Sequence, residues 1–493
     1  MKICFKSFQI ILVLLFVGLV LPAFGKPQSK PIPADCIPLL TKANTAYVHS
    51  QYSIAAPLFE SFLKKARSTD GETLFKLWDC YWQMHAYNQC NLVIKRVDKM
   101  YFTYLSSLQK IHLSELAARM DNYTQAANWL NGIKGYESRM VGFMNPQLLE
   151  NFKKDSADWH ISYLDINSGF NNFSPYLTDS LLIFCSNSPS AKSERANSWD
   201  GKSYVKLWYV PINKTAWTTL SSKNVNTQSF TNVKSTTRFL SPVYEGSDTK
   251  PIDKNSVLTK AVNFLALKNL GNLNLLGGLN IFRYNVGPAS VDRNHTIYFS
   301  VNQPKAGKDA KDRITIMQGK LIGNKVIQLK LLPFGNKNQY SVMHPAIDPS
   351  GKLLIFSSDK PDGQGGFDLY YTRRSDTKSP WDSPKPFSSN INTVGNEVFP
   401  YCSPDSVLYF SSDGREGFGG LDIYRISIKN ALNGIGTPEL LSYPINSRGD
   451  DFGWVEDSSL KTGYFTSDRI NGNDNIYHFS TNKIIGIGTL TVQ

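Results

Sequence analysis

The stretch SSDGREGFGGLDIY, residues Ser411–Tyr424, decides the fold class of this chain. The apolar run Val407–Phe410 leads into it, and Asp422–Tyr424 ends it in a second strand-like run. Four glycines between the two runs let the backbone turn where a Cβ would clash. The segment therefore predicts a β-hairpin with a long, glycine-bent connection.

The same pattern occurs twice more at a nearly constant spacing. Residues 353–370 carry it 54 residues earlier, and residues 463–477 carry it 55 residues later. A lead-in segment recurs as well, as His344-Pro345-Ala346, Phe399-Pro400-Tyr401 and Phe452-Gly453-Trp454. A fixed period of about 55 residues with several short strands in each unit is typical of β-propeller blades.

Two further blades are visible with weaker patterns. Leu181–Ser186 is followed by Val205–Val210, and Thr296–Ser300 is followed by Arg313–Ile316. The two blades lie 115 residues apart, about twice the period, so either a degenerate blade or an insertion separates them. Residues 263–279 show no blade pattern, which favours an insertion. We expect a five-bladed propeller over residues 156–482, with a sixth blade as the alternative.

A second repeat precedes the propeller, in residues 36–141. An aromatic, a small and a large apolar residue recur at one spacing, after 35 and then 36 residues: Tyr52, Ala55 and Phe59; Tyr87, Cys90 and Ile94; Tyr123, Ala126 and Leu130. This spacing is typical of tetratricopeptide repeats, whose stacked helix pairs present a groove to a peptide or helix. A generic helical bundle is the alternative. The expected fold class is thus α + β multidomain, with a tetratricopeptide-like helical stack before the propeller.

The N-terminus has the features of a secretory signal. Lys2 and Lys6 precede the apolar run Ile10–Leu21, and Ala23–Gly25 offers a small-residue cleavage site. The run is shorter than the ~20 residues that a membrane-spanning helix needs. We expect a cleaved signal peptide over residues 1–25, and therefore a location in the periplasm or at the periphery of the outer membrane. Residues 26–35 and 142–155 are expected to be linkers, and 483–493 a C-terminal tail.

The net charge and the cysteines say something about the partners and the disulfides to expect. The formal net charge is +13, and loss of the two signal-peptide lysines leaves +11. This charge is either a solvated lysine face or an attraction to acidic partners such as wall polymers; an exported protein rarely meets nucleic acid. Five cysteines remain after the signal peptide, too few and too sparse for a disulfide scaffold. Cys80 and Cys90 either form a bridge or are buried free thiols.

Sequence motifs for catalysis are missing. The chain contains no G-x-S-x-G, H-E-x-x-H or C-x-x-C motif and no phosphate-binding loop. Its seven histidines are scattered singly, and His344 occupies the repeat position held by Phe399 and Phe452, which indicates packing. We therefore predict that the chain is not an enzyme, and we assign no catalytic, cofactor-binding or metal-binding residue and no cofactor.

Two pairs of carboxylates need separate consideration. Asp359 and Asp368, and likewise Asp413 and Asp422, lie nine residues apart across a glycine loop. Such loops can hold Ca²⁺, and paired carboxylates can hydrolyse glycosides. An aspartate beside a tight turn more often accepts backbone N–H groups. Because the pair recurs from blade to blade, whereas a catalytic pair is needed once, we favour the structural role.

The blades that end at Tyr371, Tyr424 and Tyr477 resemble WD40-like propeller repeats of bacterial envelope proteins. With the signal peptide and the helical repeats, residues 36–479 resemble the propeller-containing OmpA-family proteins of the Bacteroidetes envelope. That group includes the peptidoglycan-associated component of the type IX secretion system. Lys206 and Asn475 depart from the aspartate that family blades often carry. Longer family members continue into a β-sandwich and an OmpA-like domain, and residues 484–492 look like the first strand of that sandwich.

The resemblance implies a non-enzymatic envelope scaffold, or adaptor, in type IX secretion or gliding-type machinery. Its expected partners are outer-membrane or secretion proteins, with weak association to acidic wall polymers, no nucleic acid and no membrane span. One alternative is a glycan- or peptidoglycan-binding module. Another is an envelope hydrolase with its site in the propeller channel.

Overall fold

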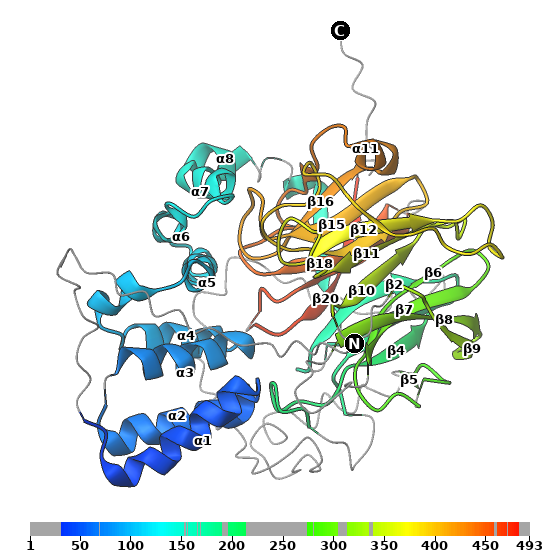
Figure 1. The fold of residues 1–493 in the computed structure, drawn as a ribbon. Coiled ribbons are helices and arrows are strands. Elements are labelled where there is room, and N and C mark those ends of the chain that lie inside the picture. Colours follow the sequence, from blue (N-terminus) through cyan, green and yellow to red (C-terminus); the bar gives the residue numbers. More distant parts are fainter. Residues whose placement is uncertain are drawn as a thin grey trace, which may run out of the picture.

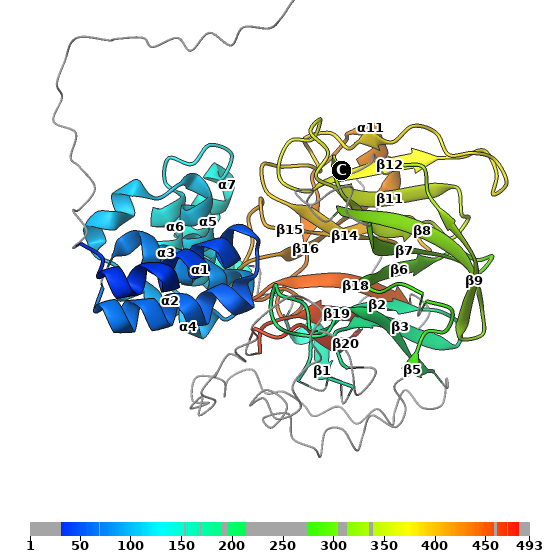
Figure 2. The ribbon, with the colours of Figure 1, turned by 60° about the horizontal axis from the view of Figure 1, so that its bottom comes forward.

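The computed structural model has a helical region on one side and a propeller on the other (Figures 1 and 2). It describes residues 31–482 except 69, 152–153, 155, 165, 168, 190–195, 213–273, 280, 304–312, 335–338, 458–460 and 471. The expected signal peptide, half of the first linker (residues 26–30) and the expected C-terminal tail lie outside these residues. Within them, no helix has the length and apolar character to cross a membrane.

The helical region comprises residues 31–158. Its elements are η1 (Ala34–Cys36), α1 (Ile37–Val48), α2 (Tyr52–Ala66), α3 (Gly71–Gln83), α4 (Tyr87–Ile94), η2 (Lys99–Tyr104), α5 (Ser107–Arg119), α6 (Tyr123–Leu130), α7 (Glu137–Met144), α8 (Pro146–Asn151) and η3 (Ser156–Asp158). Helices α7 and α8 thus occupy much of the segment expected to be a linker, because the helical packing continues to Asn151.

The repeated triplets of the sequence begin α2, α4 and α6. Their small residues, Ala55, Cys90 and Ala126, are all fully buried, which lets neighbouring helices approach closely. The structure confirms a helical region at this place, whereas the tetratricopeptide class of its repeats stays a prediction. The five cysteines of the described residues are all buried and free, so Cys80 and Cys90 form no bridge.

The propeller consists of five four-stranded antiparallel sheets. Blade one contains β2 (Asn172–Leu177), β3 (Leu181–Ser186), β4 (Lys206–Pro211) and β5 (Asn274–Leu275); blade two, β6 (Val286–Val291), β7 (Thr296–Gln303), β8 (Arg313–Ile322) and β9 (Lys325–Leu331); blade three, β10 (Val342–Ile347), β11 (Leu353–Ser358), β12 (Asp368–Arg373) and β13 (Lys385–Pro386); blade four, β14 (Glu397–Cys402), β15 (Val407–Ser412), β16 (Asp422–Ser427) and β17 (Glu439–Leu440); blade five, β18 (Asp451–Asp457), β19 (Thr462–Ser467), β20 (Asn475–Thr481) and β1 (Trp159–Tyr163). The short helix α11 (Ile428–Asn433) follows β16.

The ring closes with five blades. Strand β1, from the start of the propeller, pairs antiparallel with β20 and so completes the last blade. The Asn167 side chain reinforces this closure, because it accepts the Ile476 N–H at 2.9 Å and donates to the Ile476 carbonyl at 2.8 Å. Strand β18 packs against β2, so blade five contacts blade one. Residues 213–273 fall between β4 and β5 of blade one, which confirms the predicted insertion.

Each of the five innermost strands is broken by a β-bulge at the same place. The residue there has a positive φ in every blade: Ser174, Gly287, His344, Phe399 and Gly453. The His344 ring stacks on Phe399, with their centroids 3.9 Å apart, and Phe399 lies 4.4 Å from Phe452. The packing role predicted for His344 is therefore confirmed.

One hydrogen bond recurs in all five blades. The acceptor directly follows the second strand in four blades and is Asn302, inside β7, in blade two; the donor is the N–H of the residue before the innermost strand. The pairs, acceptor first, are Asn187 with Asn171 (2.9 Å), Asn302 with Asn285 (3.1 Å), Asp359 with Ser341 (2.5 Å), Asp413 with Asn396 (2.6 Å) and Asp468 with Asp450 (2.7 Å). This bond gives the repeated Asp359 and Asp413 the structural role that we expected.

Candidate functional site

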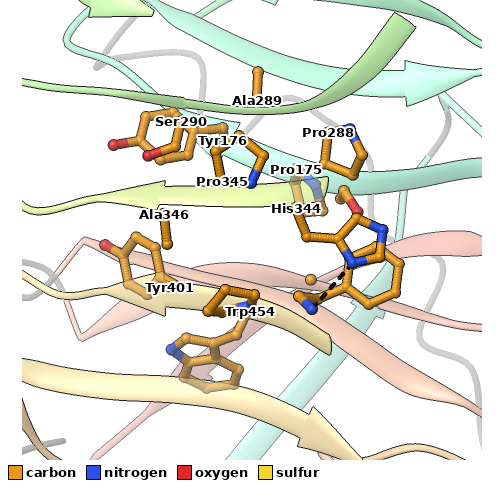
Figure 3. A pocket seen from close by; sticks show the side chains of 14 residues that line it. Pro175, Tyr176, Pro288, Ala289, Ser290, His344, Pro345, Ala346, Tyr401 and Trp454 are labelled. Carbon is orange, nitrogen blue, oxygen red and sulfur yellow. Dashed lines mark hydrogen bonds between the residues drawn. The ribbon is translucent and has the colours of Figure 1, made fainter. Parts of the chain in front are cut away.

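A small cavity lies among the innermost strands, at the mouth of the central channel (Figure 3). The volume of the cavity that water can occupy is about 30 Å³, which is enough for one or two water molecules. Its walls are prolines and aromatic rings, together with a few small side chains. Among them are Pro175, Pro288, Pro345, Tyr176, Tyr401 and Trp454. The cavity in this state is therefore too small for a sugar ring.

Most polar groups that line this cavity are engaged within the protein, whereas the buried Ser174 Oγ has no hydrogen-bond partner among the described residues. The Tyr176 hydroxyl donates to the Val291 carbonyl at 2.7 Å, and the Tyr401 hydroxyl donates to the Glu456 carbonyl at 3.3 Å. Burial lowers the pKa of His344 to about 3, so its ring is neutral. No carboxylate is among the lining side chains. The pair of carboxyl groups that most glycoside hydrolases use is thus not built into this cavity.

The second aspartate of each pair singled out in the sequence holds its own loop. Asp368 Oδ2 accepts the N–H groups of Gln364 and Gly365, at 2.8 and 3.1 Å. Asp422 Oδ2 accepts those of Phe418 and Gly419, at 3.0 and 3.3 Å. These bonds agree with the structural role and leave the glycine loops rigid at the face of the propeller.

The glycine loop of blade four, residues 413–420, is also where the helical region contacts the propeller. Arg139 of α7 is 1% exposed and inserts into this loop. Its guanidinium donates to the carbonyls of Arg415 at 3.0 Å, Gly420 at 2.9 Å and Gly419. A buried cation is thereby solvated by three backbone carbonyls, which fixes α7 on blade four.

A second buried arginine joins α5 to blade five. Arg119 Nη2 lies 2.6 Å from an Asp450 carboxylate oxygen, and Nη1 lies 2.8 Å from Asp468 Oδ1. The guanidinium also stacks over the Tyr87 ring, 4.0 Å from its centroid. Nearby, burial raises the pKa of Glu115 to about 8. The side chains of Asp468 and Arg119 are 0% and 8% exposed, so this ion pair is shielded from water.

A third contact lies at the other end of the helical region. Trp199, from the long connection of blade one, packs edge-on against Tyr52, with centroids 4.8 Å apart. Its indole N–H donates to the Gln83 carbonyl at 2.8 Å, and its own carbonyl accepts the Ser53 N–H at 3.0 Å. Three separate contacts, to blades one, four and five, hold the helical region on the propeller as one unit.

Sequence reasoning missed both interface arginines. Each stands alone in a helical pattern, as a solvated arginine would, and its partners lie more than 270 residues away along the chain. The one available signal was the aspartate repeat, which marks Asp468 as the equivalent of Asp359 and Asp413 but does not show which residue it binds.

Comparisons with known proteins add the following. No protein-family model and no curated protein matches the sequence. Among solved structures, the chain is similar to an endo-arabinase from Bacteroides thetaiotaomicron (13% identity, 66% of this chain and 98% of that one, TM-score 0.33). It is also similar to a thermostable family-43 glycoside hydrolase (10% identity, 65% of this chain and 91% of that one, TM-score 0.33). A third similar structure is a prolyl endopeptidase (11% identity, 62% of this chain and 31% of that one, TM-score 0.26). The chain thus spans about a third of the prolyl endopeptidase.

These likenesses correct one prediction. The chain was predicted not to be an enzyme because it lacks linear catalytic motifs. That inference is wrong, since hydrolases of two kinds are among the structures that the chain is similar to, and absent motifs do not exclude catalysis. At these identities and TM-scores the likenesses assign no activity. No family is shown for the chain.

Proposed function

We propose that this chain is a cell-envelope binding protein whose helical region engages a partner protein while the propeller holds that region in place. The observation that carries the proposal is the distribution of exposed apolar side chains. Ten of the eighteen large apolar side chains exposed among the described residues belong to the helical region, which supplies about a third of those residues. Exposed apolar surface favours protein contacts.

The interface geometry supports the same proposal. The buried arginines Arg119 and Arg139 fix the helices rigidly, so a partner would meet a surface that needs no ordering before it binds. The resemblance to envelope proteins of secretion machinery, together with the expected signal peptide, favours a partner at the outer membrane. Type IX secretion or gliding-type machinery is the setting that this resemblance suggests.

Matched charge variants test the proposal. Val141 and Met144, on α7, are 53% and 65% exposed; Ile322 and Leu331, on blade two, are 58% and 51% exposed. We expect the Val141→Glu/Met144→Glu double variant to lose the partner that the tagged parent copurifies from its native envelope. The Ile322→Glu/Leu331→Glu control should retain it. Equal recovery with both variants would contradict a docking surface on α7.

Glycan binding is the second candidate function, with hydrolysis as its extension. The rings of Tyr176, Tyr401 and Trp454 line the cavity, but Tyr401 and Trp454 are buried, so the cavity would have to open before a sugar ring could pack on them. The net charge of +11 expected after signal cleavage would add attraction to acidic wall polymers. Incubation with arabinan, peptidoglycan sacculi and peptides, followed by product analysis, detects turnover. Cosedimentation in 1 M salt then distinguishes specific binding, which persists, from charge-driven adhesion, which is lost.

A further inference from the structure

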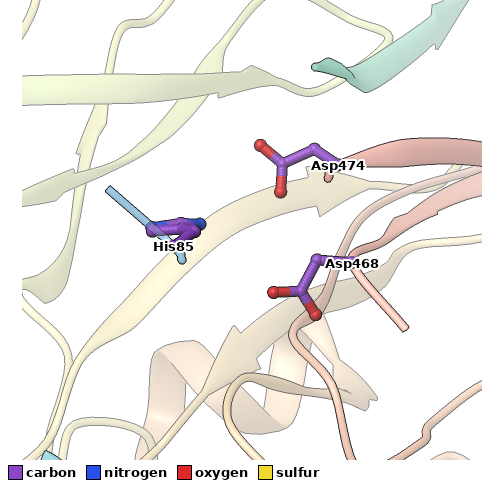
Figure 4. Close-up of side chains that lie close together, drawn as sticks. All are labelled: His85, Asp468 and Asp474. Atoms are coloured by element: carbon purple, nitrogen blue, oxygen red, sulfur yellow. The ribbon is translucent and has the colours of Figure 1, made fainter. Parts of the chain in front are cut away.

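Three potential metal ligands meet where the helical region touches blade five. His85 lies in the turn between α3 and α4, and Asp468 and Asp474 flank the loop between β19 and β20. One ligand atom from each lies within 4.8 Å of the other two. Figure 4 shows both carboxylates pointing toward the side on which the His85 ring lies. A Cβ at Gly472 would lie 2.7 Å from the His85 carbonyl oxygen, so the turn and the loop approach each other closely there.

Asp468 has a buried carboxylate oxygen that no group of the described residues satisfies. Its Oδ1 is fully used, because Arg119 Nη1 and the Asp450 N–H both donate to it. Its Oδ2 is buried and has no hydrogen-bond partner, although the side chain is 0% exposed. A buried carboxylate oxygen without a partner costs about 1–3 kcal/mol or more. Asp468 also offers a carboxylate oxygen to the cluster with His85 and Asp474.

The side chains around this cluster include more acidic than basic groups, and a divalent cation would offset the difference. The carboxylates that face the cluster are those of Asp450, Asp468, Asp474 and Asp200, and the cations are Arg119 and Lys202. Four carboxylates thus face two cations around the cluster.

We propose that His85, Asp468 and Asp474 bind one divalent transition-metal ion of the Zn²⁺ type, which joins the helical region to blade five. An imidazole nitrogen with two carboxylate oxygens suits Zn²⁺ better than Ca²⁺ or Mg²⁺, which prefer all-oxygen sets. Tetrahedral bonds of about 2.0–2.1 Å place ligand atoms ~3.3 Å apart. Small rotations of the three side chains close the present spacing to that value. His85 is exposed, so the ion has a path from solvent and water can be its fourth ligand.

Calorimetric titration of the metal-stripped full chain with ZnCl₂ tests the proposal, with parallel titrations of CaCl₂ and MgCl₂. The variants are His85→Asn and Asp474→Asn. The matched control is His295→Asn, because His295 is also exposed and also has a positive φ, 57° against 56° for His85. Asparagine tolerates that backbone conformation, so both substitutions keep the turn.

We expect the parent and the His295→Asn control to bind one Zn²⁺ with the same affinity. The His85→Asn and Asp474→Asn variants should bind Zn²⁺ at least tenfold more weakly. Zinc should also raise the melting temperature of the parent and the control but not of the two variants. Unchanged zinc affinity in the variants would overturn the proposal, and so would tighter binding of Ca²⁺ than of Zn²⁺. If a variant does not fold, the absorption spectrum of Co²⁺-loaded parent decides: four-coordinate N/O ligation supports the site, and thiolate charge-transfer bands refute it.

Discussion

Removal of the Arg139 guanidinium should separate the stability of the helical region from that of the propeller. Arg139→Met keeps the apolar stem but leaves the carbonyls of Arg415, Gly419 and Gly420 without their charged donor. Bonds to a charged group contribute about 1.5–3 kcal/mol each and do not add fully. We therefore expect a loss of about 3–5 kcal/mol in the free energy of docking the helical region.

Urea unfolding measured with two probes detects this loss. Ellipticity at 222 nm follows mainly the helices, and exchange of strand amides follows the propeller. In the parent the two transitions should coincide, and in Arg139→Met the helical transition should move to lower urea. The control is Arg96→Met, whose 3.5 Å ion pair with Glu60 is about 40% exposed on both sides and should contribute under ~1 kcal/mol. Equal midpoints for Arg139→Met and Arg96→Met would refute the reasoning.

Three further predictions concern the propeller. Gly419→Val should destabilise the fold, because its Cβ would lie 2.3 Å from the Arg448 backbone; an unchanged melting temperature would contradict this close approach. Asn167→Ala should cost about 1–3 kcal/mol in thermal unfolding, because it leaves the Ile476 N–H unpaired and removes one of the two donors to the Ile476 carbonyl where the ring closes. Burial raises the pKa of both Glu397 and Glu456 to about 7. Since the folded state then binds more protons than the unfolded state, stability should fall as the pH rises from about 4.5 through 7. Glu456→Gln should flatten that decline in urea midpoints measured across the pH range, and an unchanged slope would contradict the pKa shift.

The repeated elements of this fold could be predicted from the sequence, because a similar pattern of short strands joined by turns recurs from blade to blade. The 55-residue period predicted the blades, and the 115-residue gap predicted either a degenerate blade or an insertion, of which the insertion was favoured. The glycines of the blade-four loop are also needed for space: Gly419 and Gly420 have no positive φ, but a Cβ on each would clash, with Arg448 and Asp450 respectively.

Contacts between the two regions could not be predicted in the same way. His85, Arg119 and Arg139 each occur once and have no counterpart at the repeat period, so no pattern distinguishes them from solvated residues. Their partners come from loops that only the closed ring brings beside the helices. The absence of catalytic motifs was equally uninformative, because paired carboxylates in a propeller need not be close in sequence.

The central claim is that the helical region and the propeller form one unit, and hydrogen exchange of α7 tests it most directly. An isolated eight-residue helix is marginal in water, so protection of the Glu137–Met144 amides must come from docking. We predict slow exchange of these amides in the intact parent, and fast exchange in an Arg119→Met/Arg139→Met variant whose β3 amides stay protected. Fast exchange of α7 in the parent, or protection that survives both substitutions, would contradict the claim.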